Sequence, residues 1–139
     1  MKKATKPLFS RELKSLPDRS KTREPFITIS FRHVDPNQGQ SFEVWEEEKL
    51  LALAVSKLKG LCQCTVIQAQ AQGLIKIYPK NTWPNESEFT PPKHVQPEKW
   101  ASMHVQGKPC LIGFFEDNIL HIVFLDKEHR FWITGKKNT

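Results

Sequence analysis

The residues best suited to chemistry lie near the C-terminal end of the chain, in the segment DKEHRFW at positions 126–132. This segment places an imidazole, His129, beside a guanidinium, Arg130, with Lys127 and Trp132 close by. Metal-free cleavage of RNA needs a base for the 2′-hydroxyl, cations for the charge that grows on the phosphate, and an acid for the leaving 5′-oxygen. His129 and Arg130 are therefore candidate catalytic residues. Lys127 and Trp132 are candidates for binding the nucleic acid, the latter by stacking on a base.

Three further candidates lie on segments that alternate like β-strands. His104 shares a polar and exposed face with Ser102, and a common sheet face would bring it into one cleft with His129. We therefore include His104 among the candidate catalytic residues. Arg32 and Lys76 alternate outward on their strands and extend the candidate phosphate-binding surface.

Each of these assignments has an ordinary structural alternative. A polar turn at the end of a strand needs no function, and Phe131 and Trp132 would then belong to the core. Arg32 and Lys76 would then be plain surface charges. His121 lies on an apolar face of its strand, which is typical of a core histidine whose hydrogen bonds are satisfied.

The three cysteines do not form a metal-binding pattern in the sequence. Cys62 and Cys64 lack the spacing found between paired zinc ligands, and Cys110 brings no second ligand pair. No Gly-rich phosphate loop, H-E-x-x-H motif or Ser-His-Asp order is present. We therefore expect no bound metal and no cofactor.

Charge is distributed very unevenly along the chain. Residues 1–24 contain eight Lys or Arg and three Asp or Glu, and so carry five of the six net positive charges. Residues 25–139 are nearly neutral and predict a single domain. A basic, flexible N-terminal arm is typical of contact with nucleic acid, for which Arg11, Arg19 and Arg23 are the candidates; the alternative is a solubilising tail.

The composition also predicts where the protein resides. No run of about 18 apolar residues is present, so no transmembrane helix is expected. The N-terminus has basic residues but no apolar segment of the kind found in secretory signals. With three cysteines, an odd number, a reducing cytoplasm is the simplest setting.

Hydrophobic periodicity predicts a strand followed by two helices in the first half. Residues 26–34 alternate as a half-buried strand. Ser41 is a suitable N-cap for a helix that carries an apolar stripe through Val55 and ends at Gly60. Residues 65–68 have the form of a capping box, which predicts a second helix to about position 72.

The second half predicts strands and one long connection. The expected strands span residues 74–78, 100–106, 110–116 and 119–125, with a further edge at 131–134. Residues 119–125 are apolar on both faces, so this strand should be central and covered on both sides. Residues 79–97 contain five of the ten prolines, and Trp83 and Phe89 are expected to attach this loop to the body. The order is β, α, α, β and then a three-stranded meander, which predicts a two-layer α+β domain with an αα-hairpin packed on an antiparallel sheet.

This order resembles that of the RelE/ParE toxin superfamily. The resemblance covers residues 26–134 and rests on Trp100 opening a strand, CLIGFFEDN as a hairpin, HIVFLD as a central strand, and the closing cluster from His129 to Trp132. The sequence departs from the family in its longer Pro-rich loop and in having little net charge outside the arm.

The resemblance implies a small toxin held in check by an antitoxin protein. The RelE-like branch cleaves messenger RNA, often on the ribosome and without metal, whereas the ParE-like branch acts on gyrase and is not a nuclease. We accordingly expect a metal-independent endoribonuclease or translation inhibitor. The alternative is a non-catalytic module that acts on a protein target, or a small nucleic-acid-binding subunit of a mobile-element or phage-defence complex.

Overall fold

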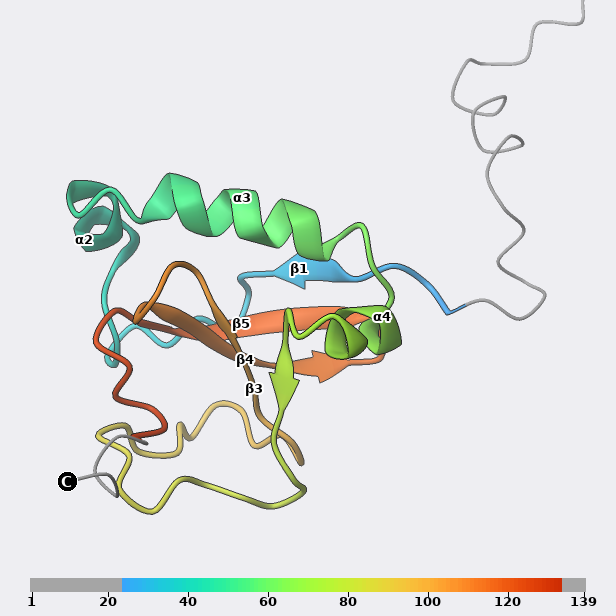
Figure 1. Ribbon diagram of the computed structural model, residues 1–139. Coiled ribbons are helices and arrows are strands. Elements are labelled where there is room, and N and C mark those ends of the chain that lie inside the picture. Colours follow the sequence, from blue (N-terminus) through green and yellow to red (C-terminus); the bar gives the residue numbers. More distant parts are fainter. Residues whose placement is uncertain (1–23, 134–139) are drawn as a thin grey trace, which may run out of the picture.

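The computed structural model describes residues 24–133, which form one five-stranded mixed sheet with helices on one face (Figure 1). The strands are β1 (Thr28–Ser30), β2 (Lys76–Ile77), β3 (Ala101–His104), β4 (Cys110–Glu116) and β5 (Ile119–Asp126). Their order across the sheet is β1-β5-β4-β3-β2. The predicted α+β class is confirmed.

The sheet is mixed because β1 runs parallel to β5, which corrects the expected antiparallel sheet. The chain leaves β1 along the outer edge of β5, where the Asp35 N–H donates to the Val123 carbonyl and the Gln40 N–H to the Leu125 carbonyl. It then passes through the helices and re-enters the sheet at β2, on the opposite edge. Since no hairpin joins β1 to its neighbour, a parallel pairing becomes possible. The strand is also much shorter than predicted, because the chain turns at residues 32–33.

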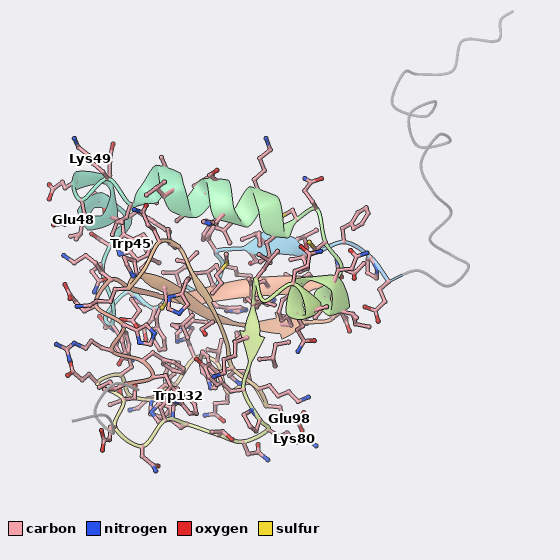
Figure 2. The ribbon with its side chains drawn as sticks, in the orientation of Figure 1. Trp45, Glu48, Lys49, Lys80, Glu98 and Trp132 are labelled. Atoms are coloured by element: carbon pink, nitrogen blue, oxygen red, sulfur yellow. The ribbon has the colours of Figure 1, made fainter. Side chains whose placement is uncertain are left out.

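The first predicted helix is divided into α2 (Phe42–Glu47) and α3 (Leu51–Leu61). Lys49 adopts a left-handed φ of 64°, its N–H donates to the Glu46 carbonyl, and the Leu50 N–H donates to the Trp45 carbonyl. These bonds form a Schellman motif, which ends α2 without a glycine. Trp45 is fully buried beneath α2, and Lys49 lies at the outer corner of the helical layer (Figure 2). The expected αα-hairpin is therefore a series of three helices.

Several local signals for the helices are confirmed, and two are wrong. Ser41 accepts a hydrogen bond from the Val44 N–H at the start of α2, and Thr65 and Gln68 form the predicted capping box of α4 (Val66–Ala71). Gly60, however, lies inside α3, which continues to Leu61. Val55 is 55% exposed and is not part of the buried stripe of α3.

The sheet buries both of its faces, as the composition of β5 predicted. Ile27, Trp45 and Leu61 pack with Ile122 and Leu125 on the helix side. The other face is covered by the Pro-rich loop at residues 79–97 and by the chain after β5 (Figure 1). Phe89 is buried against Phe124, and Trp83 contacts Trp100 and Phe131 edge-on, so the two expected anchors of the loop are confirmed.

A β-bulge between β4 and β5 changes the expected alternation of side chains. Ile112 pairs with Phe124 and Gly113 with Ile122, which leaves Val123 without a partner. Val123 and Phe124 consequently lie on the same, loop-covered face, whereas strict alternation had placed them on opposite faces. Gly113 permits the bulge, because a β-carbon there would collide with the carbonyl of His121. Residues 131–133 form no strand, so the expected final edge is not found there.

Candidate functional site

The site is built on a row of three side chains that crosses the end of the sheet. The register of β3 and β4 places His104 directly opposite Cys110, and that of β4 and β5 places Cys110 opposite Asp126. Directly opposed residues of antiparallel strands project from the same face. His104, Cys110 and Asp126 therefore lie side by side on the face that the Pro-rich loop covers.

Asp126 shapes the turn that carries His129. Its carboxylate is almost fully buried and accepts hydrogen bonds of 2.8 Å from the backbone N–H groups of Arg130 and Phe131. The loop supports the turn from outside, because the Glu88 N–H donates to the Arg130 carbonyl. His129 has a left-handed φ of 62°, a conformation that is unfavourable for a residue with a β-carbon.

This turn brings together two histidines that the sequence analysis singled out. The rings of His104 and His129 are stacked, with centroids 5.2 Å apart and an interplanar angle of 28°. His104 Nδ1 lies 2.7 Å from the Gly107 carbonyl oxygen, which can only accept a hydrogen bond. Nδ1 therefore carries the proton when the ring is neutral, and Nε2 has the free lone pair. His104 is exposed and His129 is half-buried, so both rings are accessible from solvent.

Cys110 lies beneath the histidine pair. Its thiol donates to the Lys108 carbonyl and its Sγ is 3.6 Å from His104 Nδ1. Burial, together with the nearby Asp126 carboxylate, raises the pKa of Cys110 to about 12. The thiol is therefore protonated at neutral pH and is not activated as a nucleophile.

Two aromatic rings and a lysine lie next to the histidines. Tyr78 and Trp132 are stacked, with centroids 4.4 Å apart and planes within 2° of parallel. Lys76 Nζ lies 5.1 Å from the centroid of the Tyr78 ring and 5.9 Å from that of Trp132. The Tyr78 hydroxyl shares a hydrogen bond with Ser102, and burial raises its pKa, so the hydroxyl remains protonated. Ser102 is buried, so the face it shares with His104 is not the exposed face that was expected.

These side chains line a groove of about 850 Å³ along the β2–β3 edge of the sheet. The groove extends from the C-terminal half of α3 to His129, and its lining includes two lysines, Lys57 and Lys76, and both histidines but no carboxylate. Within residues 24–133 neither lysine forms an ion pair. The groove is therefore suited to an anionic ligand with planar groups.

The other predicted site residues lie outside this groove. Arg130 forms an ion pair of 3.2 Å with Glu88, and Lys127 forms one of 3.5 Å with Glu48. Arg32 is exposed in the turn after β1, at the opposite edge of the sheet from β2. The three arginines of the N-terminal arm lie outside the described residues; they are Arg11, Arg19 and Arg23.

His121 lies in the core, as its apolar face predicted. Its Nε2 is 2.9 Å from a Glu116 carboxylate oxygen. Its Nδ1 is buried without a hydrogen-bond partner, so the expectation of a fully satisfied ring holds for only one nitrogen.

Tyr78, Ser102 and Cys110 are the site residues that the sequence analysis missed. A signal for Cys110 was present, because a hairpin centred on residue 107 places it opposite His104. No comparable signal existed for Tyr78, which meets Trp132 only because the chain after β5 folds back across β2 and β3. Two of the three cysteines lie on opposite sides of the sheet: Cys64 packs in the helix-side core and Cys110 in the loop-side core.

Comparison of the chain with protein-family models, with curated proteins and with solved structures finds no match in any of the three. Within the described residues, no helix is both long enough and apolar enough to cross a membrane. The function of the groove must therefore be inferred from its own geometry and chemistry.

Proposed function

We propose that the groove binds single-stranded RNA and that His104 and His129 cleave its backbone without a metal ion. One observation carries this proposal: the two histidines are stacked at the end of a groove that contains lysines and no carboxylate. Two imidazoles are sufficient for this reaction, because one can act as base and the other as acid near neutral pH.

The hydrogen bond from His104 to Gly107 supports His104 as the base and His129 as the acid. With its proton on Nδ1, His104 presents the lone pair of Nε2 and takes the proton of the ribose 2′-hydroxyl. The 2′-oxygen attacks the phosphorus, and the bond from phosphorus to the 5′-oxygen breaks. A protonated His129 donates its proton to that leaving oxygen. The products are a 2′,3′-cyclic phosphate and a 5′-hydroxyl, and the two histidines have exchanged protonation states.

The neighbouring residues are suited to holding the RNA. A base can extend the Tyr78–Trp132 stack, since every base offers a flat face. Lys76, which lies over both rings, is placed to neutralise the adjacent phosphate. The arginine expected to do this, Arg130, is paired with Glu88 instead.

The cellular role that accords with this activity is that of a toxin resembling the RelE-like branch. In this role the chain cleaves messenger RNA, alone or on the ribosome, and an antitoxin protein blocks the groove. The basic residues of the N-terminal arm would add sequence-independent attraction to RNA.

A non-catalytic RNA-binding module is the second candidate. It is favoured by the ion pairs of Arg130 and Lys127, which leave few free cations to stabilise the charge of the transition state. The same groove would then bind RNA through stacking and lysines alone, as part of a larger complex.

Cleavage of a fluorescent single-stranded RNA in the presence of a chelator tests the proposal. The full-length protein should produce 2′,3′-cyclic phosphate ends, and His104→Ala should slow cleavage by about 100-fold or more. His94→Ala is the matched control, since His94 is an exposed histidine that does not line the groove. Binding without cleavage would support the second candidate, and equal rates for the two variants would refute the assigned site.

A further inference from the structure

We propose that His104, Cys110 and His129 form a binding site for one transition-metal ion of the zinc type. Each residue offers one ligand atom, and the three atoms all lie within 4.8 Å of one another. No other such group of three is found in residues 24–133. Imidazole and thiolate are the ligands that zinc and related ions prefer.

The spacing of the ligand atoms matches tetrahedral coordination. With a zinc–sulfur bond of about 2.3 Å and a zinc–nitrogen bond of about 2.05 Å, a tetrahedral angle separates sulfur and nitrogen by about 3.6 Å. The separation of Cys110 Sγ and His104 Nδ1 is 3.6 Å. The strand register already holds this half of the site, because the two residues are directly opposed.

The third ligand requires only a small change of a side chain. The ligand atom of His129 already lies within 4.8 Å of the other two, whereas tetrahedral coordination needs about 3.4–3.6 Å, so the ring has to shift by about 1 Å. The Asp126 carboxylate fixes the backbone of the turn that carries His129 through two hydrogen bonds, so the His129 side chain starts from a defined position. His104 is exposed, so the ion can enter from the groove.

Binding of the ion displaces two protons from the ligand atoms, one from Cys110 Sγ and one from His104 Nδ1. The thiol proton of Cys110, which is donated to the Lys108 carbonyl, leaves to solvent. The Nδ1 proton of His104, which is donated to Gly107, moves to Nε2, and the ring turns away from the Gly107 carbonyl so that Nδ1 can bind the ion. Three protein ligands leave a fourth position for water on the side of the groove.

A bound ion would also switch off RNA cleavage. With the ion on Nδ1, Nε2 of His104 carries the proton and can no longer act as base, and His129 cannot take up the second proton that it needs to act as acid. This consequence rests on the proposed function, whereas the binding of the ion does not. Zinc would then be an inhibitor of the site.

Titration of the metal-free, full-length protein with Co²⁺ and Zn²⁺ tests the site. Co²⁺ should bind at one ion per chain and produce a thiolate charge-transfer band, which Zn²⁺ should abolish by displacement. Cys110→Ser should lose this band. It should also weaken Co²⁺ binding by more than about 100-fold, since loss of a residue that only supports a ligand typically costs about 10–100-fold. Cys62→Ser is the matched control, because Cys62 is a free, half-buried thiol that does not line the groove.

A second variant keeps the test decisive if Cys110→Ser fails to fold. His129→Gly removes one ligand at a position whose backbone favours glycine, and it should weaken Co²⁺ binding while the protein remains folded. A thiolate band that persists in Cys110→Ser, or no binding by the folded wild-type protein, would overturn the metal site.

Measuring RNA cleavage on the same samples separates the two proposals. Cleavage in chelator together with no Co²⁺ binding would reject the metal site and leave the nuclease intact. Co²⁺ binding through Cys110 with no cleavage in any condition would do the reverse. If both hold, one equivalent of Zn²⁺ should suppress cleavage, and chelator should restore it; cleavage that is unchanged by bound Zn²⁺ would refute the inhibition.

Discussion

Replacing His129 by glycine should stabilise the protein and at the same time abolish cleavage of RNA. His129 adopts a φ of 62°, which costs a residue with a β-carbon about 1–2 kcal/mol. Glycine removes this cost, but its extra freedom in the unfolded chain offsets about 0.5–1 kcal/mol of the gain. Loss of the stacked contact with His104 reduces the gain slightly further. The net free energy of unfolding should therefore rise by about 0.5 kcal/mol, which corresponds to an increase in Tm of roughly 2–3 °C.

Lys49→Gly is a matched control for the effect on the backbone. Lys49 has a φ of 64° at the junction of α2 and α3, on the opposite side of the sheet from Trp132 (Figure 2). It should give a similar or larger increase in stability, because glycine is favoured at this position of a Schellman motif. Since Lys49 does not line the groove, its replacement should leave RNA cleavage unchanged.

Urea unfolding and the initial rate of RNA cleavage, measured on the same preparations, provide the assay. A variant that is more stable and inactive would place His129 among residues kept for chemistry at the expense of stability. If His129→Gly retained full activity, the assignment of the acid would be wrong. If it were destabilised by more than about 1 kcal/mol while Lys49→Gly was stabilised, the argument from backbone strain would fail.

Three further predictions concern the support of the site, its pH dependence and its ligand. Asp126→Asn should lower the free energy of unfolding by about 1–3 kcal/mol, because the NH2 group of asparagine cannot accept a hydrogen bond and leaves one of the two backbone N–H groups without its acceptor. Urea unfolding measures this change, and a decrease of less than about 0.5 kcal/mol would contradict the prediction. The pKa of Cys110 is raised from 9.0 to about 12 in the folded protein, so the thiol ionises at a lower pH in the unfolded chain than in the folded protein. The free energy of unfolding should therefore fall as the pH rises above about 9, by up to about 1.4 kcal/mol per pH unit. Cys110→Ala should flatten this dependence between about pH 8.5 and about pH 10.5 in unfolding experiments, and an unchanged slope would refute it. Trp132→Ala should weaken binding of single-stranded RNA by about 10–100-fold in fluorescence anisotropy, since stacking contributes about 1–3 kcal/mol per base; unchanged affinity would exclude Trp132 from the binding surface.

The helix signals show where sequence-based prediction succeeds. Ser41, Thr65 and Gln68 cap their helices as predicted, because a capping bond joins residues only two or three positions apart. The break at Lys49 was missed, since a non-glycine residue enters the left-handed region there only with the support of its neighbours. These are local properties, and local sequence specifies most of them.

The sequence alone therefore determined the α+β class, the starts of α2 and α4 and the two-sided burial of β5, because these follow from periodicity, capping and composition. It also proposed His104, His129, Lys76 and Trp132 individually as site residues, and the structure places all four in the lining of one groove. Only the tertiary structure decided which of them meet. The parallel pairing of β1, the bulge at Val123 and the stacking of Tyr78 on Trp132 depend on contacts between residues far apart in the chain.

The site illustrates the physical reason for this division. The pairing of β3 with β4 brings Cys110 to His104, and buried Asp126 curls the next turn so that His129 reaches them. Each step depends on strand register, and a slip of one residue would send the side chain to the other face of the sheet. Sequence patterns show which residues are suited to chemistry, whereas register and a buried carboxylate decide that these three lie together.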